Sequence, residues 1–228
     1  MNHVRAICID LDDTLWPIGP VIEQAEAVLY EWFKLHGPEV ANNYGIEELH
    51  AAREAVLEEH PDQSHNLTFL RKAALAKVVV RAGYSEGLAE QAFSVFWQAR
   101  NQVTLYSDVV PALLRFKRSC TVLALSNGNA DLREVGLDAL FDHAVYAADV
   151  GAAKPDGAMF RAALELTGLE PNQLLHIGDD PVADMRGARE AGMFTVWLNR
   201  KGVCWPDEES PPDAEVTDLG QLADALGL

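Results

Sequence analysis

The feature that most constrains this chain is a short apolar run that ends in two closely spaced carboxylates. Residues 4–8 are apolar apart from Arg5 and predict a short buried β-strand. Asp10 and Asp12 follow it, and their side chains lie on the same face while the chain stays extended. Carboxylates beside a buried strand cost free energy unless they are paired, hydrogen-bonded or bound to a metal. The segment therefore predicts a site for a divalent cation or a nucleophile, or else a turn of the kind that Asp favours.

The charge of the chain limits its partners. Its 228 residues carry a formal net charge of −17, whereas nucleic acids and anionic membranes need a basic surface on the protein. We therefore expect no nucleic acid and no membrane as partner, although a local basic spot can still hold a phosphorylated small molecule. Apolar residues make up 49% and charged residues 23% of the chain, which predicts a globular protein rather than a disordered one.

Cysteine usage and hydropathy favour a cytoplasmic protein. The three cysteines, Cys8, Cys120 and Cys204, are odd in number and lack paired spacing, which argues against a disulfide framework and a zinc site. Cys8 in the first strand is expected to be a small buried hydrophobe. The N-terminal residues do not form a secretion signal, and no stretch approaches the roughly 18 consecutive apolar residues of a membrane span.

Residues 17–103 have a helical period and few strand signals. An apolar stripe from Ile22 to Leu35 predicts one helix, which Gly37-Pro38 ends. Three further helices are predicted over residues 46–59, 67–82 and 88–99. This pattern is typical of a small helical bundle inserted into the chain.

From Asp108 onward, strands and helices alternate with short loops. Strands are predicted at residues 121–125, 144–147, 174–177 and 194–198, and helices at 109–117, 156–167 and 181–191, with a short helix after the first of these strands. Such alternation predicts an α/β fold, with a Rossmann-like parallel sheet and helices on both of its faces. The proline- and acid-rich residues 206–213 are expected to form a surface loop or a loosely held tail.

Polar clusters follow the predicted strands. Ser126-Asn127-Gly128 ends the second strand, Gly178-Asp179-Asp180 ends the fourth, and Lys154 comes between them before a proline. The carboxyl ends of parallel strands meet at one edge of a sheet, where open α/β folds bind ligands. Taken singly, each cluster also has a structural explanation: a turn, a solvated lysine, or acids such as Asp184 that favour a helix dipole.

The ordered set of motifs resembles the haloacid dehalogenase-like (HAD) hydrolase superfamily. The matching residues are Asp10-x-Asp12-x-Thr14, Ser126-Asn127-Gly128, Lys154-Pro155 and Gly178-Asp179-Asp180 with Asp184. These motifs span nearly the whole chain. The inserted helical segment resembles the small cap domain of that family, so we expect a cap of residues 17–103 and an α/β core of residues 1–16 and 104–228.

The resemblance implies a phosphatase mechanism that depends on Mg²⁺. Asp10 would be the nucleophile that forms an aspartyl-phosphate intermediate, and Asp12 would protonate the leaving oxygen and then activate water. The carboxylates of Asp10 and Asp179 and the backbone carbonyl of Asp12 would bind the Mg²⁺. The groups that would bind the substrate phosphate are Ser126, the Asn127 backbone and Lys154.

Five further residues have supporting roles in this interpretation. Thr14 would hold the loop geometry, while Asp180 and Asp184 would orient the metal-binding groups or cap a helix. Trp16 would either stack on a planar substrate or pack between core and cap. Arg71 in the helical segment would either contact the substrate or form a salt bridge on a helix face.

Asp12 separates the branches of the family. The dehalogenases that the chain resembles lack an acid at this position, so Asp12 favours a phosphatase that acts on a small-molecule phosphate ester. Residues 126–130, 175–180 and 68–75 resemble bacterial flavin-pathway members, which dephosphorylate flavin mononucleotide (FMN) and 5-amino-6-(5-phospho-D-ribitylamino)uracil. Alternatives are a phosphoglycolate, nucleotide or sugar phosphatase, a phosphomutase, and a non-enzymatic phosphate-binding regulator. The sequence does not indicate an oligomeric state.

Overall fold

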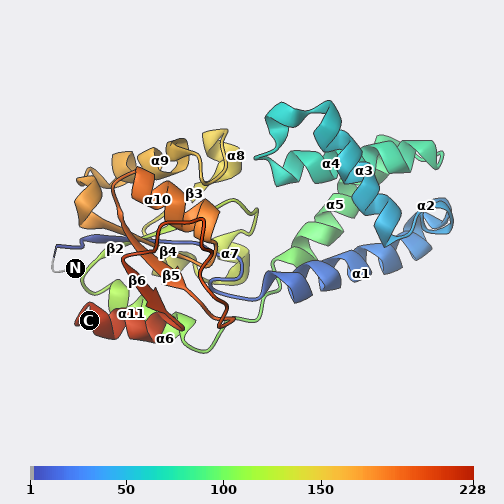
Figure 1. The fold of residues 1–228 in the computed structure, drawn as a ribbon. Coiled ribbons are helices and arrows are strands. Elements are labelled where there is room, and N and C mark those ends of the chain that lie inside the picture. Colours follow the sequence, from blue (N-terminus) through green and yellow to red (C-terminus); the bar gives the residue numbers. More distant parts are fainter. Residues whose placement is uncertain (1–2) are drawn as a thin grey trace. The chain divides into compact units, whose positions relative to one another are not determined.

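The computed structural model describes residues 3–228, which form two compact units (Figure 1). The sheet unit comprises the residues up to Pro17, Thr104–Gly128 and Gly136–Leu228. The helical unit comprises Ile18–Val103 and Asn129–Val135, so it includes a second segment besides the one expected from the sequence. Among residues 3–228, no helix has both the length and the apolar character required to cross a bilayer.

The sheet unit is built on six parallel strands in the spatial order β3-β2-β1-β4-β5-β6. The strands are β1 (Ala6–Ile9), β2 (Thr121–Ser126), β3 (His143–Tyr146), β4 (Leu174–Gly178), β5 (Phe194–Leu198) and β6 (Ala214–Val216). In β1, Ile9 lies opposite Ala124 of β2 and Ile177 of β4, so these three strands end close together. The predicted α/β fold with a parallel sheet is confirmed, and the sequence predicts the first five strands.

Helices cover both faces of the sheet. In Figure 1, α9 and α10 lie on one face, and α6 and α11 lie on the other. Their bounds are Gly157–Thr167 for α9, Gly187–Glu190 for α10, Val109–Phe116 for α6 and Leu219–Ala225 for α11, and shorter helices are α7 (Leu132–Val135) and α8 (Ala147–Val150). Cys8 is fully buried in the apolar core beneath α9, together with Leu125 and Phe160, as its apolar surroundings in the sequence predict.

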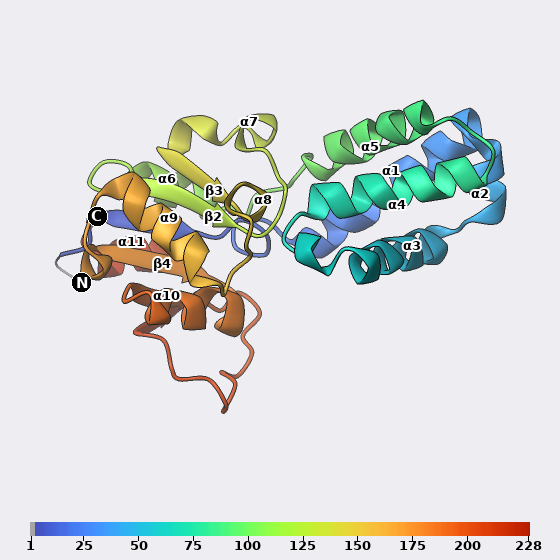
Figure 2. The same cartoon turned by 90° about the horizontal axis from the view of Figure 1, so that it is seen from above.

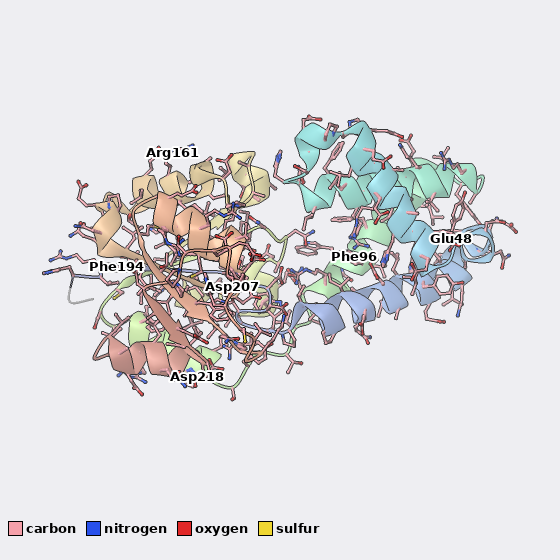
Figure 3. The ribbon with its side chains drawn as sticks, in the orientation of Figure 1. Glu48, Phe96, Arg161, Phe194, Asp207 and Asp218 are labelled. Carbon is pink, nitrogen blue, oxygen red and sulfur yellow. The ribbon has the colours of Figure 1, made fainter. Side chains whose placement is uncertain are left out.

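Besides α7, the helical unit contains α1 (Ile18–His36), α2 (Pro38–Asn43), α3 (Ile46–Glu59), α4 (Leu67–Arg81) and α5 (Glu86–Arg100). Figure 2 shows the four long helices side by side, with α5 packed against α1 and α4, and α3 packed against α4. Buried apolar residues of α1, α2, α4 and α5 form one core, and Val56 of α3 forms a second, smaller cluster with Leu70 and Ala74 of α4. Phe96, labelled in Figure 3, belongs to this core and is almost fully buried.

Three segments differ from the sequence prediction. Pro38 is not part of a loop; it is the first residue of α2, because proline suits the first turn of a helix. The predicted helix at residues 181–191 is a π-helical turn, Pro181–Arg186, followed by the short α10. β6 and α11 were not predicted, since a strand of three residues is too short to display a period.

Candidate active site

A cavity of about 180 Å³ lies where β1, β2 and β4 end. Its lining comes from four separate segments of the sheet unit and consists of Asp10, Asp12, Ser126, Asn127, Gly128, Lys154, Asp179, Asp180, Ala183 and Asp184. Parallel strands bring these segments together, because their carboxyl ends share one edge of the sheet. Eight of the eleven residues predicted for the site line this one cavity.

Lys154 lies at the centre of the polar network in this cavity. Its Nζ is 2.6 Å from Asp10 Oδ1 and 2.6 Å from Asp184 Oδ1, and its side chain is 2% exposed. Asn127 fixes its backbone, because Asn127 Nδ2 donates to Lys154 O at 2.9 Å and Lys154 N donates to Asn127 Oδ1 at 2.7 Å. The alternative that Lys154 is a solvated surface lysine is therefore wrong.

Burial and the neighbouring charges set the pKa values of the carboxyl groups in the cavity. Burial raises the pKa of Asp10 well above its usual value; Lys154 opposes this effect and Asp184 adds to it. Burial alone would raise the pKa of Asp184 as well, but Lys154 and a hydrogen bond from His176 outweigh burial and hold it below its usual range. Burial raises the pKa of Asp179 to about 7, with further increases from Asp184 and Asp13. The site thus holds more acidic groups than one lysine can balance.

The acidic cluster fits a divalent cation. Asp10, Asp179 and Asp184 each offer a carboxylate oxygen, and these three atoms lie within 4.8 Å of one another. Carboxylate oxygens are the ligands that Mg²⁺ prefers in proteins, and a cation here would relieve the charge that raises the pKa of Asp179. Both oxygens of Asp184 already accept hydrogen bonds, Oδ1 from Lys154 and Oδ2 from the Asp180 N–H, which leaves Asp10 and Asp179 as the better ligands.

Asp180 and Gly178 shape the end of β4. Asp180 caps the π-helical turn, with its Oδ1 accepting from the N–H groups of Val182 and Ala183, both at 2.8 Å. A Cβ atom at Gly178 would lie 2.2 Å from Asp184 Oδ2, so only glycine allows this carboxylate to reach Lys154. Asp180 therefore has a structural explanation, while Asp184 is held inside the polar network.

Three predicted residues do not line the cavity. Thr14 is fully buried, with its Oγ1 3.5 Å from Asp179 Oδ1. Trp16 is also fully buried and donates from Nε1 to Asp12 Oδ1 at 2.9 Å, which favours packing over stacking on a substrate. Arg71 lies in the helical unit, where it contacts Glu26 at 3.3 Å.

His176 supports the site and was missed in the sequence analysis. It is fully buried in β4, and its Nε2 is 2.9 Å from Asp184 Oδ1. Burial lowers the pKa of His176, more than the hydrogen bond with Asp184 raises it, so a neutral imidazole is favoured. An imidazole within an apolar strand is typical of a packing residue, so the sequence carried no signal for this contact.

Arg200 and Lys201 were also missed, although they come one residue after the end of β5, where ligand-binding groups of parallel sheets gather. Arg200 donates from Nε to the carbonyl of Thr14 at 2.9 Å and forms a two-point contact with Asp108 at 3.0 and 2.8 Å. Lys201 contacts Asp13 at 2.9 Å, and Asp13 has a positive φ of 59°, a conformation that Asp tolerates better than most residues. These contacts hold the turn that carries Asp12.

With this fold and site, the chain belongs to the haloacid dehalogenase-like hydrolase family, whose model matches residues 4–192. The predicted family and the prediction of a hydrolase are confirmed. The 5-amino-6-(5-phospho-D-ribitylamino)uracil phosphatase YigB of Escherichia coli (strain K12) is 26% identical over 234 residues, which cover 99% of this chain and 98% of that protein. A phosphoserine phosphatase of Thermus thermophilus is 34% identical over 164 residues, 68% of this chain and 66% of that protein.

A solved structure resembles the whole chain. The 2-haloacid dehalogenase from Pseudomonas syringae pv. tomato DC3000 superposes with a TM-score of 0.93 at 36% identity, and the match covers 98% of both chains. The relatives thus include proteins named for two different reactions.

Proposed function

We propose that this protein hydrolyses phosphate monoesters of small molecules through a covalent phosphate on Asp10. The observation that carries the proposal is the placement of Asp10, Asp12, Lys154 and Asp179 around one cavity. A nucleophile, a proton donor and a counter-charge are the groups that a two-step phosphoryl transfer needs. The flanking Ser126 and the backbone beside Gly128 offer donors for the phosphate oxygens.

In the first step, a carboxylate oxygen of Asp10 attacks the phosphorus atom. The bond between phosphorus and the ester oxygen breaks, and Asp12 gives its proton to the departing alcohol. Lys154 favours the ionised form of Asp10 against the effect of burial, because its Nζ is 2.6 Å from Asp10 Oδ1. The indole N–H of Trp16 holds the Asp12 carboxyl group in a fixed orientation.

In the second step, Asp12 takes a proton from water as the water oxygen attacks the phosphorus of the aspartyl-phosphate. The acyl phosphate bond breaks, Asp10 regains its carboxylate, and inorganic phosphate leaves. Asp184 balances the charge of Lys154 throughout, since it contacts Nζ at 2.6 Å. The site returns to its starting protonation after each turnover.

Asp10 and Asp179, with the Asp12 carbonyl, are the groups that we propose for Mg²⁺. At a separation of ~4 Å and an effective dielectric of ~20, two negative charges repel by about 4 kcal/mol, so a phosphate dianion cannot approach the carboxylates unaided. Bound Mg²⁺ supplies the positive charge that offsets this repulsion.

The substrate that we favour is a flavin-pathway phosphate, FMN or 5-amino-6-(5-phospho-D-ribitylamino)uracil. Support comes from the motifs at residues 126–130 and 175–180 and from the full-length similarity to YigB. Because one relative is named a phosphoserine phosphatase, phosphate esters that carry a carboxylate are a second class of substrate to test.

Dehalogenation is the second candidate, because the match to a 2-haloacid dehalogenase structure covers nearly the whole chain. Asp12 argues against it, since a proton donor beside the nucleophile serves an alcohol leaving group and is not needed by a halide. An activity screen with 2-chloropropionate next to the phosphate esters separates the two reactions.

The test of the proposal is Mg²⁺-dependent release of phosphate from p-nitrophenyl phosphate, followed by a screen of flavin-pathway, nucleotide, sugar and carboxylate-bearing esters ranked by kcat/KM. We expect net phosphate release by the wild type and none by Asp10→Asn. Equal rates for both proteins would refute the proposed nucleophile. A requirement for a sugar bisphosphate without net phosphate release would instead identify a mutase. If flavin-pathway esters rank no higher than the other esters, the substrate assignment is wrong and the phosphatase proposal stands.

A further inference from the structure

His176 is a polar side chain within the buried sheet, and the two-step reaction described above does not use it. It lies in β4 and is fully buried. The backbone of this strand is paired on both sides, which places His176 opposite Cys8 of β1 and Thr195 of β5. The imidazole ring packs edge-on against Phe160, with ring centres 5.4 Å apart. The sheet and α9 therefore hold this ring at a fixed position.

The direction of the hydrogen bond between His176 and Asp184 follows from the charges of the two groups. Burial alone would raise the pKa of Asp184, but Lys154 and His176 hold it below its usual range, so this carboxylate is ionised and only accepts hydrogen bonds. Burial lowers the pKa of His176, which favours a neutral imidazole with a single N–H. Because Nε2 is 2.9 Å from Asp184 Oδ1, the hydrogen must be on Nε2, which donates.

Three donors hold the Asp184 carboxylate. Oδ1 accepts from His176 and from Lys154 Nζ, and Oδ2 accepts from the Asp180 N–H at 3.1 Å. The Lys154 ammonium ends a flexible chain of four carbons, and Asp180 lies in a turn, whereas the imidazole comes from a paired strand. His176 is also neutral, so it holds Asp184 without cancelling the negative charge that attracts Lys154. It is therefore the rigid support on which the position of Asp184 depends.

The position of Asp184 in turn sets the direction of the Lys154 ammonium. An ammonium has three N–H donors. Two of them are used by Asp10 Oδ1 and Asp184 Oδ1, both at 2.6 Å from Nζ. Lys154 belongs to the lining of the cavity, which leaves the third donor for an anion there. Because the three N–H bonds have a fixed tetrahedral arrangement, two fixed acceptors determine where the third donor points.

We propose that His176 is a positioning residue for phosphate, which acts through Asp184 to aim the ammonium of Lys154 at a phosphate oxygen. The inference rests on the proposed function and deepens it, since it adds a residue that supports the binding of the phosphate group. Without the imidazole N–H, the Asp184 carboxylate can turn, and Lys154 turns with it. Phosphate then loses a well-directed contact with a positive charge, a contact that strengthens as charge develops in the transition state.

The experiment measures binding of inorganic phosphate in the presence of Mg²⁺ by isothermal titration calorimetry. His176→Phe keeps a ring against Phe160 but has no donor, and we expect it to weaken phosphate binding about tenfold or more. His176→Gln places an amide N–H near the position of the imidazole Nε2 and should regain most of the lost affinity. His143→Phe is the matched control, because His143 is a half-buried residue of the edge strand β3, and it should bind phosphate as the wild type does.

The value of kcat/KM with p-nitrophenyl phosphate should fall in the same order, lowest in His176→Phe and nearly restored in His176→Gln. Circular dichroism establishes that each variant is folded, and His176→Leu serves as a second variant without a donor if the core does not accept phenylalanine. Wild-type affinity in the donorless variant overturns the inference, as does a folded His176→Gln that binds as weakly as that variant. A wild type that binds no phosphate overturns it as well. Failure of the proposed hydrolysis is seen separately, as phosphate binding without release of phosphate from p-nitrophenyl phosphate.

Discussion

The cavity of the sheet unit and the Glu26 cluster of the helical unit, in which Glu26 contacts His50 and Arg71, differ in the sign of the charge that they leave unbalanced. The cavity places five aspartates around one lysine, whereas the Glu26 cluster places an arginine and a histidine around one glutamate. The first arrangement favours a cation and the second favours an anion. The net charge of the whole chain therefore does not predict the chemistry of each unit.

Their construction differs as well. The groups in the cavity lie on loops at strand ends, where adjacent strands align backbone segments that are distant in sequence. The cations of the Glu26 cluster lie inside helices, where the helical period fixes which side chains share a face. Substitutions in the cavity should therefore affect turnover, whereas substitutions in the Glu26 cluster should affect the stability of the helical unit.

The largest expected effect is that of Asp10→Asn. Loss of the nucleophile should lower kcat with p-nitrophenyl phosphate on the order of 10⁴-fold or more. Asp207→Asn is the control, because Asp207 is exposed and should leave kcat as it is. A kcat of Asp10→Asn equal to that of the wild type would show that another group is the nucleophile.

Removal of the metal should have the next largest effect. We expect a chelator to abolish turnover and added Mg²⁺ to restore it, and Asp179→Asn to weaken the apparent Mg²⁺ affinity at least about 10- to 100-fold. The measurement is a titration of activity with Mg²⁺. Wild-type turnover that persists in excess chelator would show that the unbalanced acids of the cavity serve another purpose.

Gly178→Ala tests how the acidic network is packed. The added Cβ would lie 2.2 Å from Asp184 Oδ2, so the carboxylate must move away from Lys154, and we expect a loss of about 1 to 3 kcal/mol in unfolding free energy together with a lower kcat. Gly19→Ala is the matched control in α1, since no atom lies within 4 Å of a Cβ at that position. Urea denaturation of both variants measures the difference, and equal stabilities would mean that the close approach of Asp184 is not required.

The smallest expected effect concerns Asp108, which binds Arg200. Burial alone would raise the pKa of Asp108, but hydrogen bonds from Arg200 and from the Leu219 N–H outweigh it and lower the pKa below 3.8. A lowered carboxyl pKa contributes stability that is present above the unfolded value and is lost as pH falls through the folded value.

Asp108→Asn should therefore destabilise the protein at neutral pH by about 1 kcal/mol or less and by still less near pH 2. Urea denaturation at several pH values measures this slope, with Asp224→Asn as an exposed control. A penalty that is the same at both ends of the pH range would show that Asp108 acts through its shape and not its charge.

The sheet and the residues at its edge could be predicted because buried parallel strands are continuous apolar runs. The last apolar residue of each run shows where the strand ends, so the next residue can be predicted to lie at the edge of the sheet without knowledge of the rest of the fold. Asp10, Ser126 and Asp179 are found in this way, and all three line the cavity.

Other features depend on tertiary contacts that leave no periodic trace. His176 is one of the five residues of the apolar strand β4. It has a hydrogen-bonding partner only because the following turn brings Asp184 next to it. In the π-helical turn at Pro181–Arg186, Asp184 packs against Gly178, a tertiary contact that helix propensities do not contain. Arg71 has the pattern of an ordinary helix-surface cation, but in the structure it contacts Glu26 of α1 and the Phe96 ring of α5.

The edge strands of the sheet affect how the protein behaves in concentrated solution. Its border strands, β3 and β6, have four and three residues, so each offers few free backbone groups on its outer side. Short borders are poor templates for the strands of other molecules. Concentrated solutions should therefore resist the intermolecular β-pairing that initiates fibrils.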